Sequence, residues 1–227
     1  MLEVEGRQVY TTLEELVQPS HTALLVVDMQ KDFCSPGYAF SQQGIDISMY
    51  AGMVPRLARL LGAARRAEVM VIFIQMTVLP HRRSESPAQI RFNMRMHLGE
   101  RGPSQPLWYT LEGSPGQELI PELVPSEGEL LVKKYRSSGF WGTNLDLLLR
   151  SNLIKTVLIG GCTTEGCVES TARDALFNDY YVVIAEDCVA SDDRDQHQAS
   201  MLLMRHRFDV AGSEEIIHTW GTQDAEQ

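Results

Sequence analysis

The chain has 227 residues, of which 44% are hydrophobic and 22% charged, and this length and composition suit a folded domain with a substantial core. Its formal net charge of −10 argues against binding to nucleic acid, and no apolar run is long enough to span a membrane. The first residues lack a signal-peptide pattern, and four cysteines are too few for a disulfide framework, so we expect a cytoplasmic protein with free thiols.

Short apolar runs alternate with helical patterns along most of the chain. Because the apolar residues of each run are consecutive rather than alternating, the runs are typical of parallel strands that are covered on both faces. The expected strands are 23–27, 69–75, 129–133, 156–160, 181–186 and 208–212, and the expected helices are 53–67, 143–151, one from about 166, and 193–206. This order predicts a doubly wound α/β fold.

Two segments lie outside this alternation. Residues 1–20 form an N-terminal extension, and residues 77–125, which are rich in proline and glycine, interrupt the pattern after the second strand. A connection of that length in a compact domain is usually functional or part of an interface. We therefore expect a single domain over residues 1–227 that carries this extension and this insertion.

Reactive side chains follow three of the expected strands. Asp28 follows the first, Lys133 and Lys134 end the third, and Cys162 and Cys167 follow the fourth. Taken singly, an aspartate there is often a helix cap, a lysine a solvated charge and a cysteine a packing residue. Ligands of open parallel sheets bind outside the carboxyl ends of the strands, so an acid, an amine and a thiol should meet at one edge.

The cysteines in "GGCTTEGC" admit several explanations. Their spacing does not match a C-x-x-C redox motif, no second pair completes a zinc site, and no glycine-rich nucleotide motif is present. Cys167 stands where a glycine-rich turn enters a helix, and N–H groups there favour a thiolate and can hold an oxyanion. We interpret Cys167 as a nucleophile, Cys162 as its structural neighbour, and Cys34 and Cys188 as packing residues.

Four blocks of sequence carry a family resemblance. "LLVVDMQKDFCSPG", "KKYRSSGFWGTNLDLLLR", "GGCTTEGCVESTARDAL" and "EDCVAS" resemble the signatures of the isochorismatase-like cysteine hydrolases. The resemblance implies a six-stranded, mainly parallel sheet with helices on both faces, and a catalytic triad of Asp28, Lys134 and Cys167. It also implies a cis peptide bond between Cys162 and Thr163, and an oxyanion hole formed by the backbone N–H groups of Thr163 and Cys167.

The resemblance also implies an activity. "YRSSGF" and "CVESTARDA" look most like the ureidoacrylate amidohydrolases, with biuret hydrolases and N-carbamoylsarcosine amidases also near. Such a member would cleave a C–N bond of a small amide or ureido compound through a thioester, releasing ammonia or an amine. The alternatives are a vinyl ether hydrolase of the isochorismate type, disfavoured because those enzymes typically lack the nucleophilic cysteine, and a non-catalytic binding protein.

We expect no metal and no other cofactor. The metal-dependent nicotinamidase branch of the family carries histidines after the first strand, whereas the corresponding segment here reads "GIDISMY". A zinc or iron site built mainly from imidazoles therefore has no candidate ligands in that segment.

Residues that flank the triad are candidates for substrate binding. Phe33, Tyr135 and Trp141 are expected in the pocket wall, and Gln30 is expected either to bind substrate or to tie down its own loop. Arg136 follows the predicted catalytic lysine by two residues and could bind an anionic group of the substrate.

The insertion concentrates arginine within an acidic chain. Residues 81–101 hold Arg82, Arg83, Arg91, Arg95 and Arg101 against Glu85 and Glu100. A guanidinium can bind both oxygens of a carboxylate, which suggests an acidic substrate, although these arginines could equally pair with acidic residues across a subunit interface. Apolar side chains in the same insertion, Met94, Met96, Trp108 and Tyr109, predict a homodimer or homotetramer.

Overall fold

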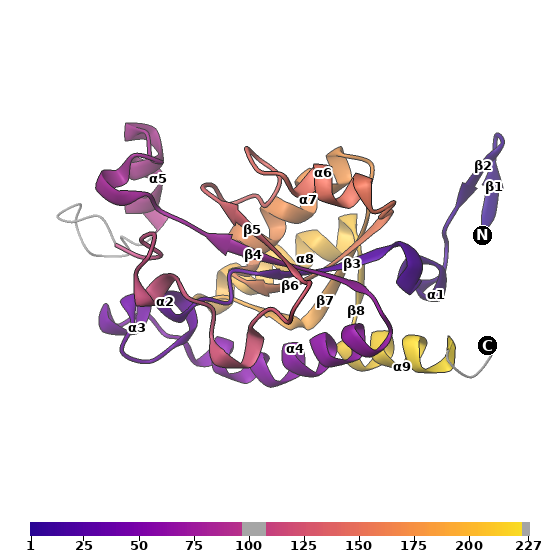
Figure 1. The fold of residues 1–227 in the computed structure, drawn as a ribbon, viewed down its shortest axis with the longest axis horizontal. Helices are drawn as coiled ribbons and strands as arrows, with labels where there is room; N and C mark the ends of the chain where they lie inside the picture. The colour runs from indigo at the N-terminus through magenta and orange to yellow at the C-terminus, as the bar shows by residue number, and fades with distance from the viewer. Residues whose placement is uncertain (97–107, 224–227) are drawn as a thin grey trace.

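A six-stranded parallel sheet forms the centre of the molecule in the computed structural model, which describes residues 1–96 and 108–223 (Figure 1). The strands are β3 (Thr22–Val27), β4 (Met70–Met76), β5 (Leu130–Lys134), β6 (Thr156–Cys162), β7 (Tyr181–Ala190) and β8 (Asp209–Ala211), in the spatial order β5-β4-β3-β6-β7-β8. The predicted fold class is confirmed, and all six expected strands are present. β7 is longer than expected, because its pairing with β6 continues through a register shift as far as Ala190.

The register of the strands brings the predicted site residues to one edge. Val27 pairs with Gly161 of β6, and Met76 of β4 pairs with Lys134 of β5. The chain winds from β3 through β4 to β5 on one side and resumes with β6 on the other side of β3. This reversal of strand order leaves a crevice at the carboxyl ends of β3 and β6, where ligands bind in such sheets.

Helices cover both faces of the sheet (Figure 1). α4 (Ser48–Arg66) and α9 (Ser213–Gln223) pack in the same core as Leu24 and Val26 of β3. α6 (Leu145–Ser151), α7 (Glu169–Phe177) and α8 (Arg194–Arg207) pack in the same core as Leu25 and Val27. Successive side chains of a strand point to opposite faces, so the fully buried run of β3 serves both cores. The expected helices are present, but α4 begins five residues before the expected Met53, one turn and a half earlier.

Shorter elements make up the remaining segments. The N-terminal extension forms a hairpin of β1 (Leu2–Val4) and β2 (Arg7–Val9), which projects from the body, and α1 (Leu13–Leu16) (Figure 1). α2 (Lys31–Cys34) and α3 (Ala39–Gln42) follow β3, and α5 (Pro87–Met96) lies in the insertion. Short 3-10 helices span Pro19–His21, Pro80–Arg82, Pro115–Gln117 and Pro121–Leu123. Within residues 1–96 and 108–223, none of the helices combines the length and apolar content that a membrane crossing requires.

Candidate active site

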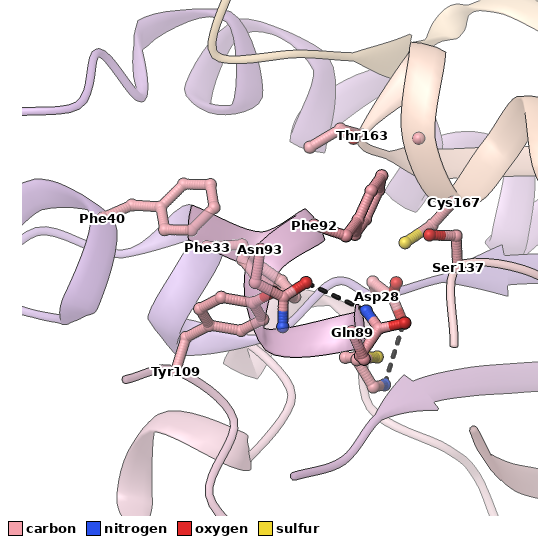
Figure 2. A pocket seen from close by; sticks show the side chains of 12 residues that line it. Asp28, Phe33, Phe40, Gln89, Phe92, Asn93, Tyr109, Ser137, Thr163 and Cys167 are labelled. Atoms are coloured by element: carbon pink, nitrogen blue, oxygen red, sulfur yellow. Dashed lines mark hydrogen bonds between the residues drawn. The ribbon is translucent and has the colours of Figure 1, made fainter. Parts of the chain in front are cut away.

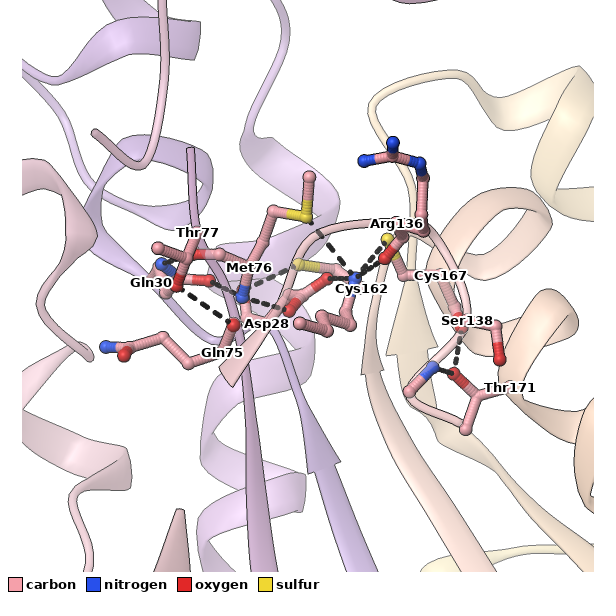
Figure 3. Close-up of polar contacts among 12 residues, drawn as sticks. Asp28, Gln30, Gln75, Met76, Thr77, Arg136, Ser138, Cys162, Cys167 and Thr171 are labelled. Carbon is pink, nitrogen blue, oxygen red and sulfur yellow. Dashed lines mark hydrogen bonds and ion pairs between the residues drawn. The ribbon is translucent and has the colours of Figure 1, made fainter. Parts of the chain in front are cut away.

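Lys134 contacts both other residues of the predicted triad at the carboxyl edge of the sheet, where Figure 3 shows Asp28 and Cys167. The Lys134 Nζ atom lies 2.8 Å from Asp28 Oδ2 and donates a hydrogen bond of 3.0 Å to Cys167 Sγ. Lys134 is fully buried, and so is Asp28, which stands directly after β3 with a left-handed φ of 53°. The structure thus brings an acid, an amine and a thiol together from three separate segments.

Both charged partners are held by neighbouring backbone. Asp28 Oδ1 accepts from the Met76 N–H at 2.9 Å, which fixes the carboxylate against β4. The Lys134 ammonium also donates to the Arg136 carbonyl at 3.1 Å. Lys133, the other candidate at the end of β5, is exposed and forms an ion pair of 2.9 Å with Glu112. The structure therefore supports the choice of Lys134 over its neighbour.

Burial raises the pKa of the Cys167 thiol to about 12. The charge of Lys134 acts to lower this pKa, whereas the charge of Asp28 raises it further. Burial acts to lower the pKa of Lys134, but the charges of Asp28 and Cys167 outweigh it and raise this pKa above its ordinary value. The net shift favours the neutral thiol of Cys167 in the resting site, and the ammonium of Lys134 is the group that acts toward the thiolate.

Cys167 lies in an irregular turn between β6 and α7. Residues Thr164–Val168 form a single π-helical turn, and the Cys167 carbonyl accepts from Thr171 Oγ1 at 2.6 Å. The peptide bond between Cys162 and Thr163 is cis, as the resemblance implies. Gly161 has a φ of 127°, and a Cβ there would lie 2.1 Å from the Val27 carbonyl oxygen, so only glycine fits this approach to β3.

The remaining cysteines are buried thiols, as predicted for packing residues. Cys162 Sγ donates to the Asp28 carbonyl at 3.3 Å and lies 3.9 Å from Cys34 Sγ. Cys162 therefore faces the core beneath the site, whereas Cys167 faces the pocket.

A pocket opens above the thiol (Figure 2). It is lined by Asp28, Phe33, Phe40, Met76, Gln89, Phe92, Asn93, Tyr109, Ser137, Thr163, Gly166 and Cys167. Its cavity volume of about 60 Å³ suits a small molecule. Four of its twelve lining residues are aromatic, and its polar groups come from α5, Ser137 and the catalytic edge. Thr163 and Cys167, whose N–H groups are the predicted oxyanion donors, both border it.

The predicted substrate-binding residues differ in where they lie. Phe33 lines the pocket, whereas Gln30, Tyr135, Arg136 and Trp141 are not among the lining residues. Gln30 is fully buried, and its amide nitrogen donates to the carbonyls of Met76 and Gln117, both at 2.9 Å. These contacts favour the loop-anchoring interpretation, because a side chain enclosed by backbone partners has no surface for a ligand.

Arg136 and Trp141 lie toward the exterior. One guanidinium nitrogen of Arg136, Nη1, donates to the carbonyls of Ser84 and Tyr135, and the guanidinium lies 5.4 Å from the ring centre of Trp141, which is 64% exposed. Arg136 thereby joins the insertion to the loop after β5. Its contacts are those of a structural link rather than of a pocket group.

Several lining residues could not be identified from the sequence. Gln89, Phe92 and Asn93 come from α5, Phe40 comes from α3, and Tyr109 lies in the loop that begins at residue 108. Tyr109 packs on Phe33 and Phe40 with ring centres 5.4 and 6.0 Å away, so it folds back onto its own chain and not outward as expected. The helix α5 itself, Pro87–Met96, was not expected within the insertion.

The described arginines of the insertion do not line the pocket. Arg82 forms an ion pair of 2.6 Å with Glu85, and its guanidinium lies 4.0 Å from the ring centre of Trp108. Arg91 and Arg95 are exposed on α5, and Arg101 lies outside the described residues. A carboxylate on the substrate therefore has no described arginine to meet inside the pocket.

The part of the chain that the structure describes contains no group of three or more histidine, cysteine or acidic side chains that could hold a metal ion. Metal independence nevertheless stays a prediction, which requires an assay.

A family model described as "Isochorismatase domain" matches residues 22–215. The chain belongs to the isochorismatase family. Relatives in this family include the ureidoacrylate amidohydrolase RutB of Enterobacter sp. (strain 638), 35% identical over 172 residues that cover 74% of this chain and 75% of the relative. The protein of the same name from Pantoea ananatis is 35% identical over 173 residues, which cover 74% of this chain and 69% of the relative.

Solved structures of the isochorismatase fold agree with this assignment. A cysteine hydrolase from Pseudomonas syringae pv. phaseolicola has a TM-score of 0.75 and 27% identity, with 90% of this chain and 94% of that chain covered. An N-carbamoylsarcosine amidase from Thermoplasma acidophilum has a TM-score of 0.64 and 27% identity, with coverage of 85% and 96%. The predicted family is confirmed, and this isochorismatase-family protein is an enzyme of the hydrolase class.

Proposed function

We propose that this protein is a cysteine-dependent amidohydrolase that cleaves a C–N bond of a small amide or ureido compound. The observation that carries the proposal is the contact of Lys134 with both Asp28 and Cys167 at the base of a small pocket. Relatives named ureidoacrylate amidohydrolase and a structural neighbour named N-carbamoylsarcosine amidase support the same class of substrate.

The first step is nucleophilic attack by sulfur. Since burial keeps Cys167 protonated, a base must take the proton as the S–C bond forms, and Asp28 is the carboxylate beside the thiol. The sulfur adds to the substrate carbonyl carbon, and the carbonyl oxygen becomes an oxyanion. The N–H groups of Thr163 and Cys167 are proposed to bind this oxygen, and losing one such donor typically costs about 10²-fold in rate.

The intermediate then collapses and is hydrolysed. The C–N bond breaks as Asp28 returns its proton to the departing nitrogen, so ammonia or an amine leaves and an acyl group remains on sulfur. Water, deprotonated by the same carboxylate, attacks the thioester and restores the thiol. These proposed steps use only side chains, backbone groups and water.

Lys134 has an electrostatic role in this scheme. Its ammonium lies 2.8 Å from Asp28 Oδ2 and compensates the charge of the proposed base. It also contacts the sulfur and offsets negative charge that develops there during attack. A neutral residue at this position would supply neither interaction.

Ammonia release from a panel of small amides and ureides tests the proposal. The expected result is steady release from at least one carbamoyl compound, lost after iodoacetamide treatment and unchanged in the presence of a strong chelator. A vinyl ether hydrolase or a non-catalytic binding protein would release no ammonia. The absence of ammonia from every compound of the panel would therefore contradict the amidohydrolase proposal. A loss in chelator that zinc or iron restores would contradict metal independence alone.

A further inference from the structure

Two amide side chains of α5 lie in the pocket wall beside four aromatic residues. Gln89 and Asn93 are separated by four residues, so they lie one helical turn apart on the same face of α5, and both line the pocket (Figure 2). Gln89 Nε2 donates to Asn93 Oδ1 at 3.0 Å. Neither residue is used in the proposed chemistry.

A buried ion pair fixes the orientation of the Asn93 amide. Glu85 Oε2 accepts from Arg82 Nη1 at 2.6 Å, and the Glu85 side chain is 3% exposed. Its other oxygen, Oε1, accepts from Asn93 Nδ2 at 2.6 Å. A carboxylate held by a guanidinium can only accept hydrogen bonds, so Asn93 must turn its NH₂ group toward Glu85. Its oxygen then has to face the opposite way, toward Gln89.

The orientation of Gln89 follows from that of Asn93. Because Asn93 presents an oxygen, Gln89 must present its NH₂ group to Asn93, which leaves the Gln89 oxygen on the other side of the amide. Among the described residues, no group donates to Gln89 Oε1, although the side chain is only partly exposed and borders the pocket. The series Arg82, Glu85, Asn93, Gln89 thus ends in an acceptor that is available to a ligand.

We propose that Gln89 is a specificity-determining residue that accepts a hydrogen bond from a substrate N–H group, and that Glu85 and Asn93 are positioning residues that set its orientation. This inference rests on the proposed amidohydrolase function and narrows its substrate class to ureido compounds, R–NH–CO–NH₂. In such a molecule the Cys167 sulfur attacks the carbonyl carbon, and the internal N–H group donates a hydrogen bond to the Gln89 oxygen. The site should disfavour an analogue in which an oxygen replaces this N–H group. The substrate oxygen and the Gln89 oxygen would then face each other, and neither can donate a hydrogen bond.

A matched pair of substrates isolates this hydrogen bond. The carbamate ester R–O–CO–NH₂ has the same shape as the ureide and releases ammonia from the same carbonyl, but it has an oxygen where the ureide has N–H. The quantity to measure is kcat/KM for the ureide divided by kcat/KM for the carbamate. Comparing this ratio between enzymes cancels the different intrinsic reactivities of the two compounds.

Gln89→Met keeps the length of the side chain and removes the acceptor. We expect it to lower the ureide-to-carbamate ratio about tenfold, which is the order of one lost hydrogen bond, mainly through kcat/KM for the ureide. Gln198→Met, at an exposed position on α8, is the matched control and should leave the ratio unchanged. A ratio that is the same in wild type and Gln89→Met overturns the inference.

Glu85→Gln tests the positioning role. A glutamine at position 85 can donate a hydrogen bond to Asn93, so the amide groups of Asn93 and Gln89 can each rotate by 180°. The ureide-to-carbamate ratio should then fall toward that of Gln89→Met. Thermal unfolding that remains cooperative checks that the variant is folded. An unchanged ratio in Glu85→Gln overturns the positioning role of the series. If wild type releases ammonia from neither compound while it hydrolyses other amides, the assignment of ureido compounds as the substrate class is contradicted. Absence of ammonia from every amide instead contradicts the proposed function itself.

Discussion

Lys134 compensates two acidic groups at once. Its ammonium is fully buried and contacts the Asp28 carboxylate and the Cys167 sulfur, while the Arg136 carbonyl accepts a third hydrogen bond. Removing one partner of a buried ion pair leaves a charge without compensation and typically costs about 3–5 kcal/mol of stability. The same residue thus supports both the fold and the proposed chemistry.

Lys134→Met should therefore lower the free energy of unfolding by about 3–5 kcal/mol and abolish detectable hydrolysis. Lys133→Met is the control, because its exposed ion pair with Glu112 is worth at most about 1 kcal/mol. Denaturant unfolding and ammonia release measure the two effects. Equal stability losses in the two variants would contradict the assignment of Lys134 as the buried partner.

Asp28→Asn separates the reactivity of the thiol from catalysis. Since the charge of Asp28 raises the pKa of Cys167 and that of Lys134 lowers it, removing the carboxylate should lower this pKa and increase the thiolate fraction at neutral pH. Alkylation of Cys167 by iodoacetamide should become roughly tenfold faster for each unit by which the pKa falls, while hydrolysis is lost with the base.

The pH dependence of alkylation in wild type checks the direction in which the pKa of Cys167 is shifted. A folded-state pKa of about 12 means that the alkylation rate keeps rising with pH beyond the range in which an ordinary thiol, of pKa about 8.5, reaches its plateau. Slower alkylation of Asp28→Asn at neutral pH, or a wild-type plateau at about pH 10 or below as for an ordinary thiol, would contradict the raised pKa of Cys167 and its dependence on Asp28.

At the scale of elements, a buried carboxylate joins α2 to residues 110–116 of the insertion. Asp32 accepts from the Thr110 N–H at 2.6 Å, next to the pocket residue Tyr109. Gly116 packs directly on this carboxylate, and a Cβ there would lie 2.0 Å from Asp32 Oδ1. The packing of the segment after the pocket wall therefore depends on the absence of a side chain at Gly116.

Gly116→Ala should displace Asp32 and lower the free energy of unfolding by about 1–3 kcal/mol, with a loss of activity as Tyr109 moves. Gly52→Ala, in helix α4 where a Cβ meets nothing within 4 Å, should be neutral or stabilising. Thermal unfolding of both variants measures the contrast. Equal stability of Gly116→Ala and wild type would mean that the segment tolerates the added methyl group.

The sheet and the three residues at its edge could be predicted because their signals are local. A consecutive apolar run predicts a buried strand. The position of Asp28 or Lys134 at the carboxyl edge of the sheet then follows from its position at the end of that strand. Gln89 and Asn93 could not be predicted as pocket residues, since they reach the pocket only because the fold places α5 beside Asp28 and Cys167, which are distant in the sequence. The pKa of Cys167 likewise depends on burial by distant segments.

At the scale of the whole molecule, the question is how many copies assemble. Large apolar side chains remain exposed on the three helices that cover one face of the sheet: Leu147 is 66% exposed, Phe177 is 74% exposed and Leu202 is 71% exposed. Trp108 of the insertion is 53% exposed, whereas Tyr109 packs inward. Exposed apolar surface of this kind often marks a contact between subunits.

We therefore predict a homodimer or homotetramer. Light scattering should give a mass that is twice or four times the 25.5 kDa of one chain. A mass of 25.5 kDa at the working concentration of the enzyme would contradict an oligomer and would leave these side chains exposed on a monomer.

The central claim is that Cys167 is the nucleophile of an amidohydrolase, and ammonia release by two cysteine variants tests it most directly. Cys167 faces the pocket in contact with Lys134, whereas Cys162 is fully buried and bonded to the Asp28 carbonyl. On a ureido substrate that the wild type hydrolyses, Cys167→Ala should release no ammonia above background, and Cys162→Ala should retain a measurable fraction of the wild-type rate. Activity that persists in Cys167→Ala and disappears in a folded Cys162→Ala would contradict the account.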